Sequence, residues 1–124
     1  MKKIAALIPA RAGSKGVPHK NIRKICGYPL ILYSLAACKF CEQIGDVYIS
    51  TDDREIADVA EKYGAKVPFL RPKKYADDKS TDYQYLKHFF SKIDVDEVAL
   101  IRPTTPLRNP VIVGGFIEKY YKIK

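Results

Sequence analysis

The chain has 124 residues, of which 47% are hydrophobic and 29% are charged, a balance that excludes a disordered segment and indicates one globular domain. No apolar run approaches the roughly 20 residues of a membrane-spanning helix, so we expect no membrane association. The formal net charge is +8. Eight basic residues and no acidic residue precede Glu42, and this asymmetry predicts that the amino-terminal third binds a polyanion.

The amino terminus and the cysteines indicate a cytoplasmic protein. The first nine residues resemble a secretion signal, but Arg11 interrupts the apolar run too early and no convincing cleavage site follows. Three cysteines cannot form a closed set of disulfides. Cys38 and Cys41 follow an apolar helical pattern, whereas redox motifs place their thiolate at the start of a helix. We therefore interpret both as small buried side chains.

The apolar pattern predicts four strands that alternate with four helices. Residues 4–8 form a short continuous apolar run, which is typical of a strand buried on both faces. Three further strands are expected over 46–50, 66–69 and 97–101. Apolar residues at helical spacing lie within 30–38, 56–63, 85–90 and 112–120.

Short polar residues mark where these helices begin and end. Thr51 or Asp52 is expected to cap the second helix, and Ser80 or Thr81 the third, because their side-chain oxygens can accept backbone N–H bonds. Gly64 stands where a left-handed residue ends the second helix.

The alternation predicts an α/β fold of the Rossmann-like, doubly wound type, with a mostly parallel sheet and helices on both faces. Right-handed crossovers bring every loop that follows a strand to one edge of the sheet. Ligands of such sheets bind at that edge, outside the carboxyl ends of the strands. The loops expected there are 10–24, 50–53, 70–80 and 102–109.

The loop after the first strand has the chemistry of a phosphate site. Gly13 and Gly16 allow tight turns and a close approach of the backbone to a ligand, while Arg11, Lys15 and Lys20 supply three cations. The spacing matches neither of the glycine-rich fingerprints of kinases and dinucleotide-binding proteins. A solvated basic loop is the alternative interpretation.

Five segments add a more specific pattern, in this order along the chain: Ile8-Pro9-Ala10-Arg11-Ala12-Gly13-Ser14-Lys15-Gly16-Val17-Pro18-His19-Lys20-Asn21, Ser50-Thr51-Asp52-Asp53, Val67-Pro68-Phe69-Leu70-Arg71-Pro72, Ala76-Asp77-Asp78-Lys79-Ser80-Thr81-Asp82 and Arg102-Pro103-Thr104-Thr105-Pro106-Leu107-Arg108. Together they resemble the acylneuraminate cytidylyltransferases, the CMP-sialic acid synthetase family. Members of this family couple CTP to a nine-carbon 2-keto-3-deoxy sugar acid and release pyrophosphate. The resemblance runs from Ile4 to the end of the chain.

The resemblance implies roles for the positions that match. Arg11 and Lys20 would be the catalytic cations, which stabilise charge on the α-phosphate and on the departing pyrophosphate. Asn21 would contact the nucleotide sugar, and Arg71 and Ser80 would lie near the cytosine. The full nucleotide-binding set implied is Ala10, Arg11, Ser14, Lys15, Lys20, Asn21, Arg71 and Ser80. The sugar acid would bind Arg102 and Thr104.

The chain departs from the family pattern in two ways. Arg102 stands where sialate-activating members usually have glutamine, and arginine could pair with a carboxylate or mark a branch that uses another nonulosonic acid. The chain also has roughly half the usual length. In the family the other half carries the acidic pair that holds Mg²⁺ and the dimerisation lobe. We therefore treat residues 1–124 as a partial nucleotidyltransferase domain, assign no metal ligand, and expect a homodimer only for a longer protein.

Several functions follow from these features. The leading hypothesis is a cytidylyltransferase in which the anomeric hydroxyl of a nonulosonic acid attacks the α-phosphate of CTP and gives a CMP-sugar and pyrophosphate. An inactive or partial nucleotide-binding fragment is the alternative, and a related sugar-phosphate nucleotidyltransferase is another. A basic nucleic-acid-binding module ranks far behind, because the chain has no RNA-recognition aromatic motif. We expect no nucleic-acid partner.

Overall fold

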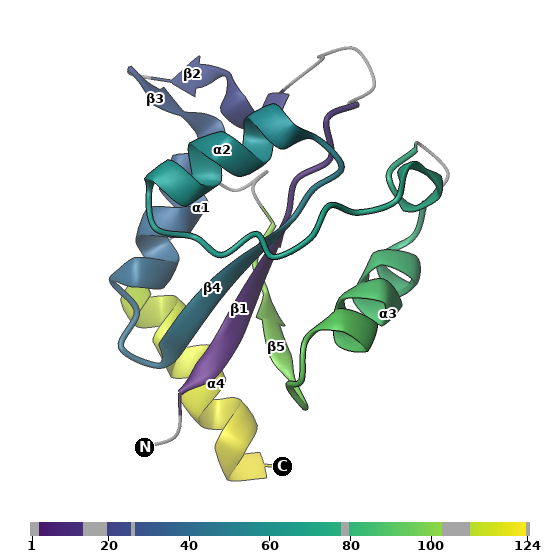
Figure 1. Cartoon of the computed structure of the whole chain (residues 1–124). Helices are drawn as coiled ribbons and strands as arrows, with labels where there is room; N and C mark the ends of the chain where they lie inside the picture. The colour runs from purple at the N-terminus through teal and green to yellow at the C-terminus, as the bar shows by residue number, and fades with distance from the viewer. Residues whose placement is uncertain (1–2, 14–19, 26, 78–79, 103–109, 124) are drawn as a thin grey trace.

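The structure, a computed structural model, describes residues 3–13, 20–25, 27–77, 80–102 and 110–123. Figure 1 shows how its strands and helices are arranged. In chain order they are β1 (Ile4–Pro9), η1 (Lys20–Ile22), β2 (Lys24–Ile25), β3 (Tyr28–Pro29), α1 (Leu30–Lys39), β4 (Ile44–Ser50), α2 (Arg54–Lys62), η2 (Lys73–Tyr75), α3 (Asp82–Lys92), β5 (Val98–Leu100) and α4 (Pro110–Ile123).

Strands β4, β1 and β5 form a parallel sheet in that order, which confirms the predicted α/β fold. The third predicted strand is reduced to a single parallel bridge between Tyr48 and Lys66. The Lys66 N–H donates to the Val47 carbonyl (2.9 Å) and the Lys66 carbonyl accepts from Ile49 (3.0 Å). Pro68 has no N–H and cannot continue this ladder. The chain thus steps from β1 through β4 to Lys66, then crosses back to β5 beside β1.

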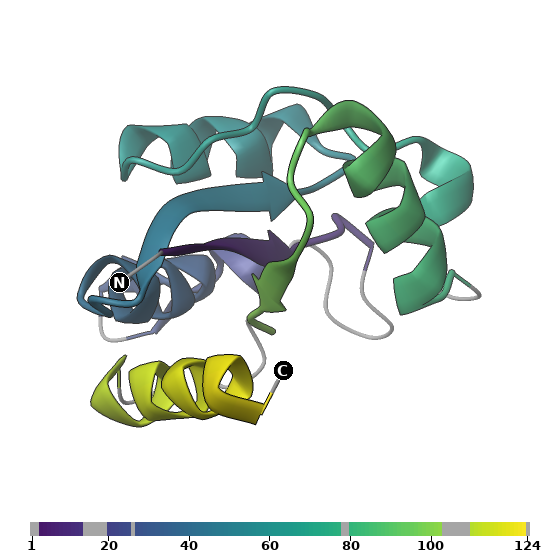
Figure 2. The ribbon, with the colours of Figure 1, turned by 90° about the horizontal axis from the view of Figure 1, so that it is seen from below.

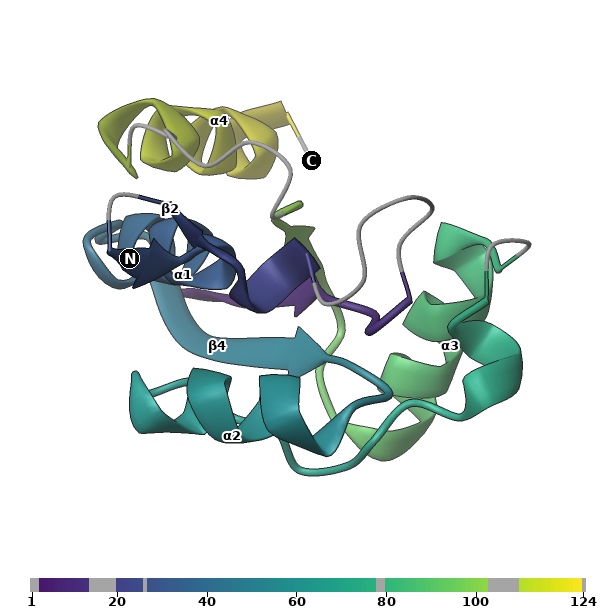
Figure 3. The same ribbon diagram turned by 90° about the horizontal axis from the view of Figure 1, so that it is seen from above.

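Alternate side chains of the strands divide the core into two layers. Ala6 and Ile8 of β1 pack with residues of α1, α2 and α4 on one face of the sheet. Leu7 points to the opposite face, where it packs with Tyr85 and Phe89 of α3. Figure 1 shows the same division, with α3 to the right of the strands and α1 and α2 to their left. In Figures 2 and 3, α3 again lies at the right of the view, away from the other three helices. The sheet is therefore doubly wound, as predicted.

Helix α2 begins one residue later than the sequence suggested. Its cap is Asp53, whose extended backbone lets the carboxylate accept a hydrogen bond from the Ile56 N–H (3.2 Å). The expectation of Thr51 or Asp52 as the cap was wrong, because both residues precede the turn into the helix. The Thr51 hydroxyl instead accepts from the Asp53 N–H (3.2 Å). The Asp52 carboxylate binds a backbone N–H of the loop after β1.

The other predicted helix boundary signals are present. Thr81 caps α3 and forms a reciprocal capping box with Gln84. Gly64 follows α2 with a φ of +93°, the left-handed conformation that glycine adopts without strain. The hairpin of β2 and β3, which turns at Gly27 with a φ of +86°, was not predicted. Its strands have two residues each, too few to show a periodic pattern.

Cys38 and Cys41 are both buried, so their interpretation as small core side chains is confirmed. Within the described residues, no helix combines the length and the apolar character that a membrane crossing requires.

Candidate nucleotide-binding site

The candidate site lies at the edge of the sheet where the strands end. Since β1, β4 and β5 are parallel, their carboxyl ends share one edge, toward the top of Figure 1. The order of connections reverses between β1 and β5, and ligands of such sheets bind in the crevice outside this reversal point. Arg11 follows β1 and Arg102 follows β5, so one arginine stands on each side of it.

The backbone that carries Arg11 is held at three consecutive residues. The N–H of Ala10 donates to the Ser50 carbonyl at the end of β4 (2.8 Å). The Arg11 carbonyl accepts from the side-chain amide of Asn21 (3.0 Å), and both Asn21 and Ala10 are buried. The N–H of Ala12 donates to a carboxylate of the loop after β4 (2.8 Å). These hydrogen bonds therefore hold the backbone from which the Arg11 side chain extends.

The carboxylate that binds Ala12 belongs to Asp52, and only 5% of this side chain is exposed. Its second oxygen accepts a hydrogen bond from the Lys73 ammonium (2.8 Å), whose side chain is largely exposed. Burial by itself would raise the pKa of Asp52, but the hydrogen bonds from Lys73 and Ala12 outweigh it and lower that pKa below its ordinary value. Asp52 is thus an ionised carboxylate that joins three loops.

Arg71 ties the end of β4 to the loop that follows residue 70. Its guanidinium is buried and donates to the Ser50 hydroxyl (3.0 Å), the Ser50 carbonyl (2.7 Å) and the Tyr75 carbonyl (3.0 Å). It also stacks over the Tyr85 ring, 4.6 Å from the ring centre. Burial lowers the pKa of Arg71, and the nearby charge of Arg11 acts in the same direction.

Ser80 stabilises the loop between η2 and α3. Its hydroxyl accepts from the Asp77 N–H (3.0 Å) and lies within donor distance of the Asp77 carboxylate (3.0 Å) and the Lys74 carbonyl (3.3 Å). These bonds set the shape of the loop next to Arg71.

Arg102 forms an ion pair with Asp82, the first residue of α3. The other oxygen of Asp82 accepts from the Tyr85 hydroxyl (2.8 Å). Burial, reinforced by this hydrogen bond, raises the pKa of Tyr85, which keeps the phenol protonated as a donor. Because Tyr85 also lies under the Arg71 guanidinium, a continuous set of contacts joins Arg71 to Arg102.

The structure therefore places several predicted site residues at one edge: Ala10, Arg11, Asn21, Arg71, Ser80 and Arg102. The backbone of Lys20 begins η1, but its side chain lies outside the described part of the chain, as do Ser14, Lys15 and Thr104.

The side chains that hold these residues, namely Ser50, Asp52, Asp82 and Tyr85, were not predicted as site residues from the sequence. Ser50, Asp52 and Asp82 nevertheless stand in segments that resemble the family. However, which group each would meet depends on contacts over long sequence separations, such as the 40 residues between Ala12 and Asp52.

The described residues offer no ligand set for a metal. No group of three or more His, Cys, Asp or Glu side chains among them could hold an ion. Asp52 and Asp53 follow β4, but the Asp52 oxygens bind Ala12 and Lys73, and Asp53 caps α2. The implied Mg²⁺ therefore does not fit the acidic side chains of these loops.

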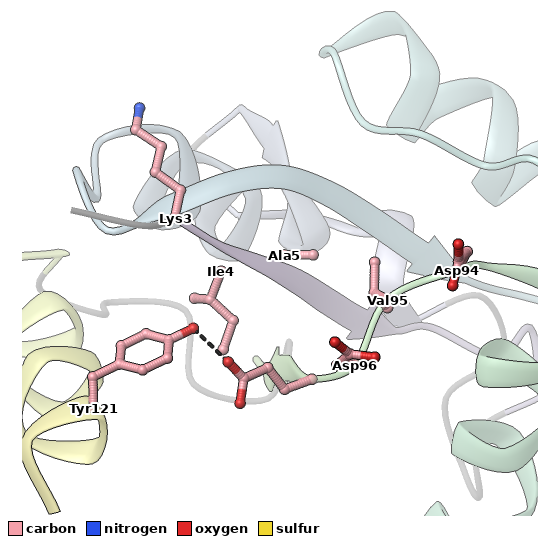
Figure 4. Close-up of a pocket in the computed structure, with 8 residues that line it drawn as sticks. Lys3, Ile4, Ala5, Asp94, Val95, Asp96 and Tyr121 are labelled. Carbon is pink, nitrogen blue, oxygen red and sulfur yellow. Dashed lines mark hydrogen bonds between the residues drawn. The ribbon is translucent and has the colours of Figure 1, made fainter. Parts of the chain in front are cut away.

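A separate small cavity lies at the opposite edge of the sheet. Figure 4 shows Lys3 before β1, and Asp94 and Asp96 before β5, around this cavity. The Tyr121 hydroxyl donates to the Glu97 carboxylate there (2.8 Å) and fastens α4 to the start of β5. Because this is the amino-terminal edge of the strands, it is not where ligands of parallel α/β sheets bind.

The fold defines an α/β domain with cationic side chains at the edge where its parallel strands end. The family model described as cytidylyltransferase matches residues 5–122, and the chain belongs to this family.

Similar proteins fall within the same family. The chain is 41% identical to the CMP-N,N'-diacetyllegionaminic acid synthase of Legionella pneumophila, over 94% of this chain and 52% of that protein. It is 38% identical to the pseudaminic acid cytidylyltransferase of Campylobacter jejuni, over 92% of this chain and 51% of the relative. The N-acylneuraminate cytidylyltransferase of Escherichia coli is 35% identical over 98% of this chain and 29% of its own length. The chain thus spans about half the length, or less, of these relatives.

A solved structure supports the fold. A CMP:2-keto-3-deoxy-manno-octonic acid synthetase, solved in complex with CTP, superimposes with a TM-score of 0.84 at 21% identity. The match covers 98% of this chain and 48% of that one. It confirms the Rossmann-like arrangement of the sheet and its helices.

Proposed function

We propose that this chain acts as a cytidylyltransferase, which binds CTP and uses it to activate a nonulosonic acid. The main support for the proposal is that hydrogen bonds hold the backbone of Arg11 at the reversal point of the sheet. The loop that contains Arg11 lies within the residues that match the cytidylyltransferase family model. Relatives that activate legionaminic, pseudaminic and N-acylneuraminic acids support this substrate class.

In the proposed reaction, the anomeric hydroxyl of the sugar acid attacks the α-phosphate of CTP. The new bond joins that oxygen to phosphorus, the bond from phosphorus to the bridging oxygen breaks, and pyrophosphate leaves. The hydroxyl proton passes to solvent. Arg11 and Lys20 stabilise the negative charge that builds up on the transferred phosphate and the leaving group. Pre-positioned cations suit this chemistry because phosphoryl transfer depends mainly on positioning and electrostatic stabilisation.

The nucleotide and the sugar acid occupy opposite sides of the reversal point in this proposal. Ser14, Lys15, Arg11 and Lys20 serve the phosphates, and Ala10 and Asn21 shape the loop beside the nucleotide sugar. Arg71 and Ser80 hold the loop that borders the cytosine. Arg102, with Thr104, receives the sugar acid, since a guanidinium can bind a carboxylate in a bidentate fashion.

Other parts of the proposal concern conditions and partners. We expect Mg²⁺ to assist the reaction, with ligands from outside the described residues. We place the reaction in the cytoplasm, because three cysteines cannot form a closed set of disulfides, which is typical of a protein of a reducing compartment. A homodimer is proposed only for a protein that also contains the other half of the relatives' length.

Pyrophosphate release tests the proposal. The chain would be incubated with Mg²⁺, CTP and each of three acids, namely N,N'-diacetyllegionaminic, pseudaminic and N-acetylneuraminic acid. Turnover with one acid, lost in Lys20→Ala and kept in the surface control Arg54→Ala, is the expected result. CTP binding without turnover would favour the second candidate, a nucleotide-binding unit that needs the other half, which the half-length match to the relatives supports. No CTP binding by the folded chain would exclude both.

A further inference from the structure

The loop that follows β1 and carries Arg11 is anchored by a buried carboxylate. A negative group beside a triphosphate site opposes ligand binding by charge, so its presence calls for a compensating role. Asp52 is 5% exposed, and both of its oxygens accept hydrogen bonds of 2.8 Å, one from the Ala12 N–H and one from the Lys73 ammonium. Such charge-assisted bonds are the strong ones in proteins.

These bonds fix the residue that follows Arg11. The Arg11 carbonyl is already held by Asn21, and Ala10 is tied to the end of β4. Asp52 fixes the next N–H, which belongs to the same peptide group as the Arg11 carbonyl, so the peptide that follows Arg11 is held at both its oxygen and its nitrogen. An arginine side chain has several rotatable bonds, and a fixed backbone limits the directions in which it can point.

Lys73 compensates the negative charge of the Asp52 carboxylate. Its ammonium lies on the exposed side of Asp52 and neutralises the charge that would repel a phosphate. Asp53, the neighbouring carboxylate, contributes to the raised pKa of Lys73, but less than Asp52 does. The loops after β1, β4 and residue 70 thus meet at one neutralised ion pair.

We propose that Asp52 is a positioning residue for nucleotide binding, because its carboxylate holds the Ala12 N–H and thereby aims the Arg11 guanidinium at the phosphates of the nucleotide. This inference rests on the proposed function. Asp52 touches neither CTP nor the reacting atoms and acts through Arg11.

Two variants separate positioning from charge. Asp52→Ala removes the acceptor and the negative charge, while Asp52→Asn removes the charge but retains an oxygen that can accept from Ala12. If Asp52 acted only by charge, both variants would bind the triphosphate more tightly. Positioning predicts that Asp52→Ala weakens CTP binding about tenfold, as loss of a charge-assisted hydrogen bond would. Asp52→Asn should stay within about threefold of the wild type.

The experiment is a calorimetric titration with CTP of the wild type, both Asp52 variants and Asp58→Ala. Asp58 is the matched control, since it is an exposed carboxylate paired with Arg54 (3.0 Å) away from the site. Equal or tighter binding by folded Asp52→Ala overturns the inference, and so does an Asp52→Asn variant as weak as Asp52→Ala. Absence of CTP binding by the wild type overturns the proposed function and the inference together, whereas wild-type binding with an unaffected Asp52→Ala overturns the inference alone.

A second measurement does not depend on the folding of a variant. Nuclear magnetic resonance can detect a scalar coupling across the hydrogen bond, between the Ala12 amide nitrogen and the Asp52 side-chain carboxyl carbon. We expect this coupling in the wild type and its persistence when CTP is added. Its absence from the wild type would contradict the role assigned to Asp52.

Discussion

Arg71→Met offers a sharp test of how the site edge is held together. The wild-type guanidinium is buried and donates to the Ser50 hydroxyl, the Ser50 carbonyl and the Tyr75 carbonyl. Methionine is unbranched like the arginine stem, but it is shorter and donates no hydrogen bond. The Ser50 carbonyl keeps its bond from Ala10, whereas the Tyr75 carbonyl and the Ser50 hydroxyl lose their charged donor.

The magnitude follows from these partners. A hydrogen bond to a charged group contributes about 1.5–3 kcal/mol, and the contact with the Tyr85 ring adds roughly 1 kcal/mol. Removing the guanidinium also removes the cost of burying it, which offsets part of the loss. We therefore expect Arg71→Met to lower the free energy of unfolding by about 2–4 kcal/mol.

Equilibrium unfolding in urea, followed by far-ultraviolet circular dichroism, measures this change. The matched control is Arg54→Met, since Arg54 is exposed and pairs with Asp58 and Glu61 on α2. Exposed pairs contribute at most about 1 kcal/mol, so the control should stay near the wild type. If Arg71→Met is no less stable than Arg54→Met, the buried arginine does not hold the edge together.

Two further predictions concern stability. Gly64→Ala should lower the free energy of unfolding by about 1 kcal/mol, because Gly64 has a φ of +93°. Gly115→Ala should raise it by up to about 1 kcal/mol, because Gly115 lies within α4 and an added Cβ would meet no other atom. Unfolding in urea measures both changes, and changes of the same sign would contradict the reasoning. Since the folded state lowers the pKa of Asp52, its stabilising contribution is present above its ordinary pKa of 3.8 and is lost as the pH falls through the lower folded value. The wild type should therefore lose more stability than Asp52→Asn between about pH 5 and pH 3, and parallel pH profiles would show that Asp52 gains nothing on folding.

Much of the fold could be predicted because its signals are local. The apolar run of β1 and the helical spacing of the later segments identify the parallel sheet, and Thr81 caps α3 as expected. Predictions were weaker where two adjacent residues carry the same chemistry. Asp52 and Asp53 can both cap a helix, and only the point at which the backbone turns decides between them.

The site was predictable in its position but not in its supports. Parallel strands bring their following loops to one edge, so Arg11 and Arg102 could be assigned to it from the order of elements alone. The hydrogen bond between Ala12 and Asp52 could not be predicted, because it depends on how two loops, 40 residues apart in the sequence, lie relative to each other in the folded chain. The burial of Arg71 could not be predicted either, since an arginine in a loop normally faces solvent.

The central claim is that this half-length chain binds CTP through the loop that carries Arg11. Isothermal titration of the folded wild type with CTP and Mg²⁺, beside Arg11→Ala, tests it most directly. We predict saturable binding by the wild type and a loss of at least about tenfold in Arg11→Ala, since an arginine–phosphate contact is charge-assisted. Equal affinities in the two proteins, or a folded wild type that does not bind CTP, would contradict the account.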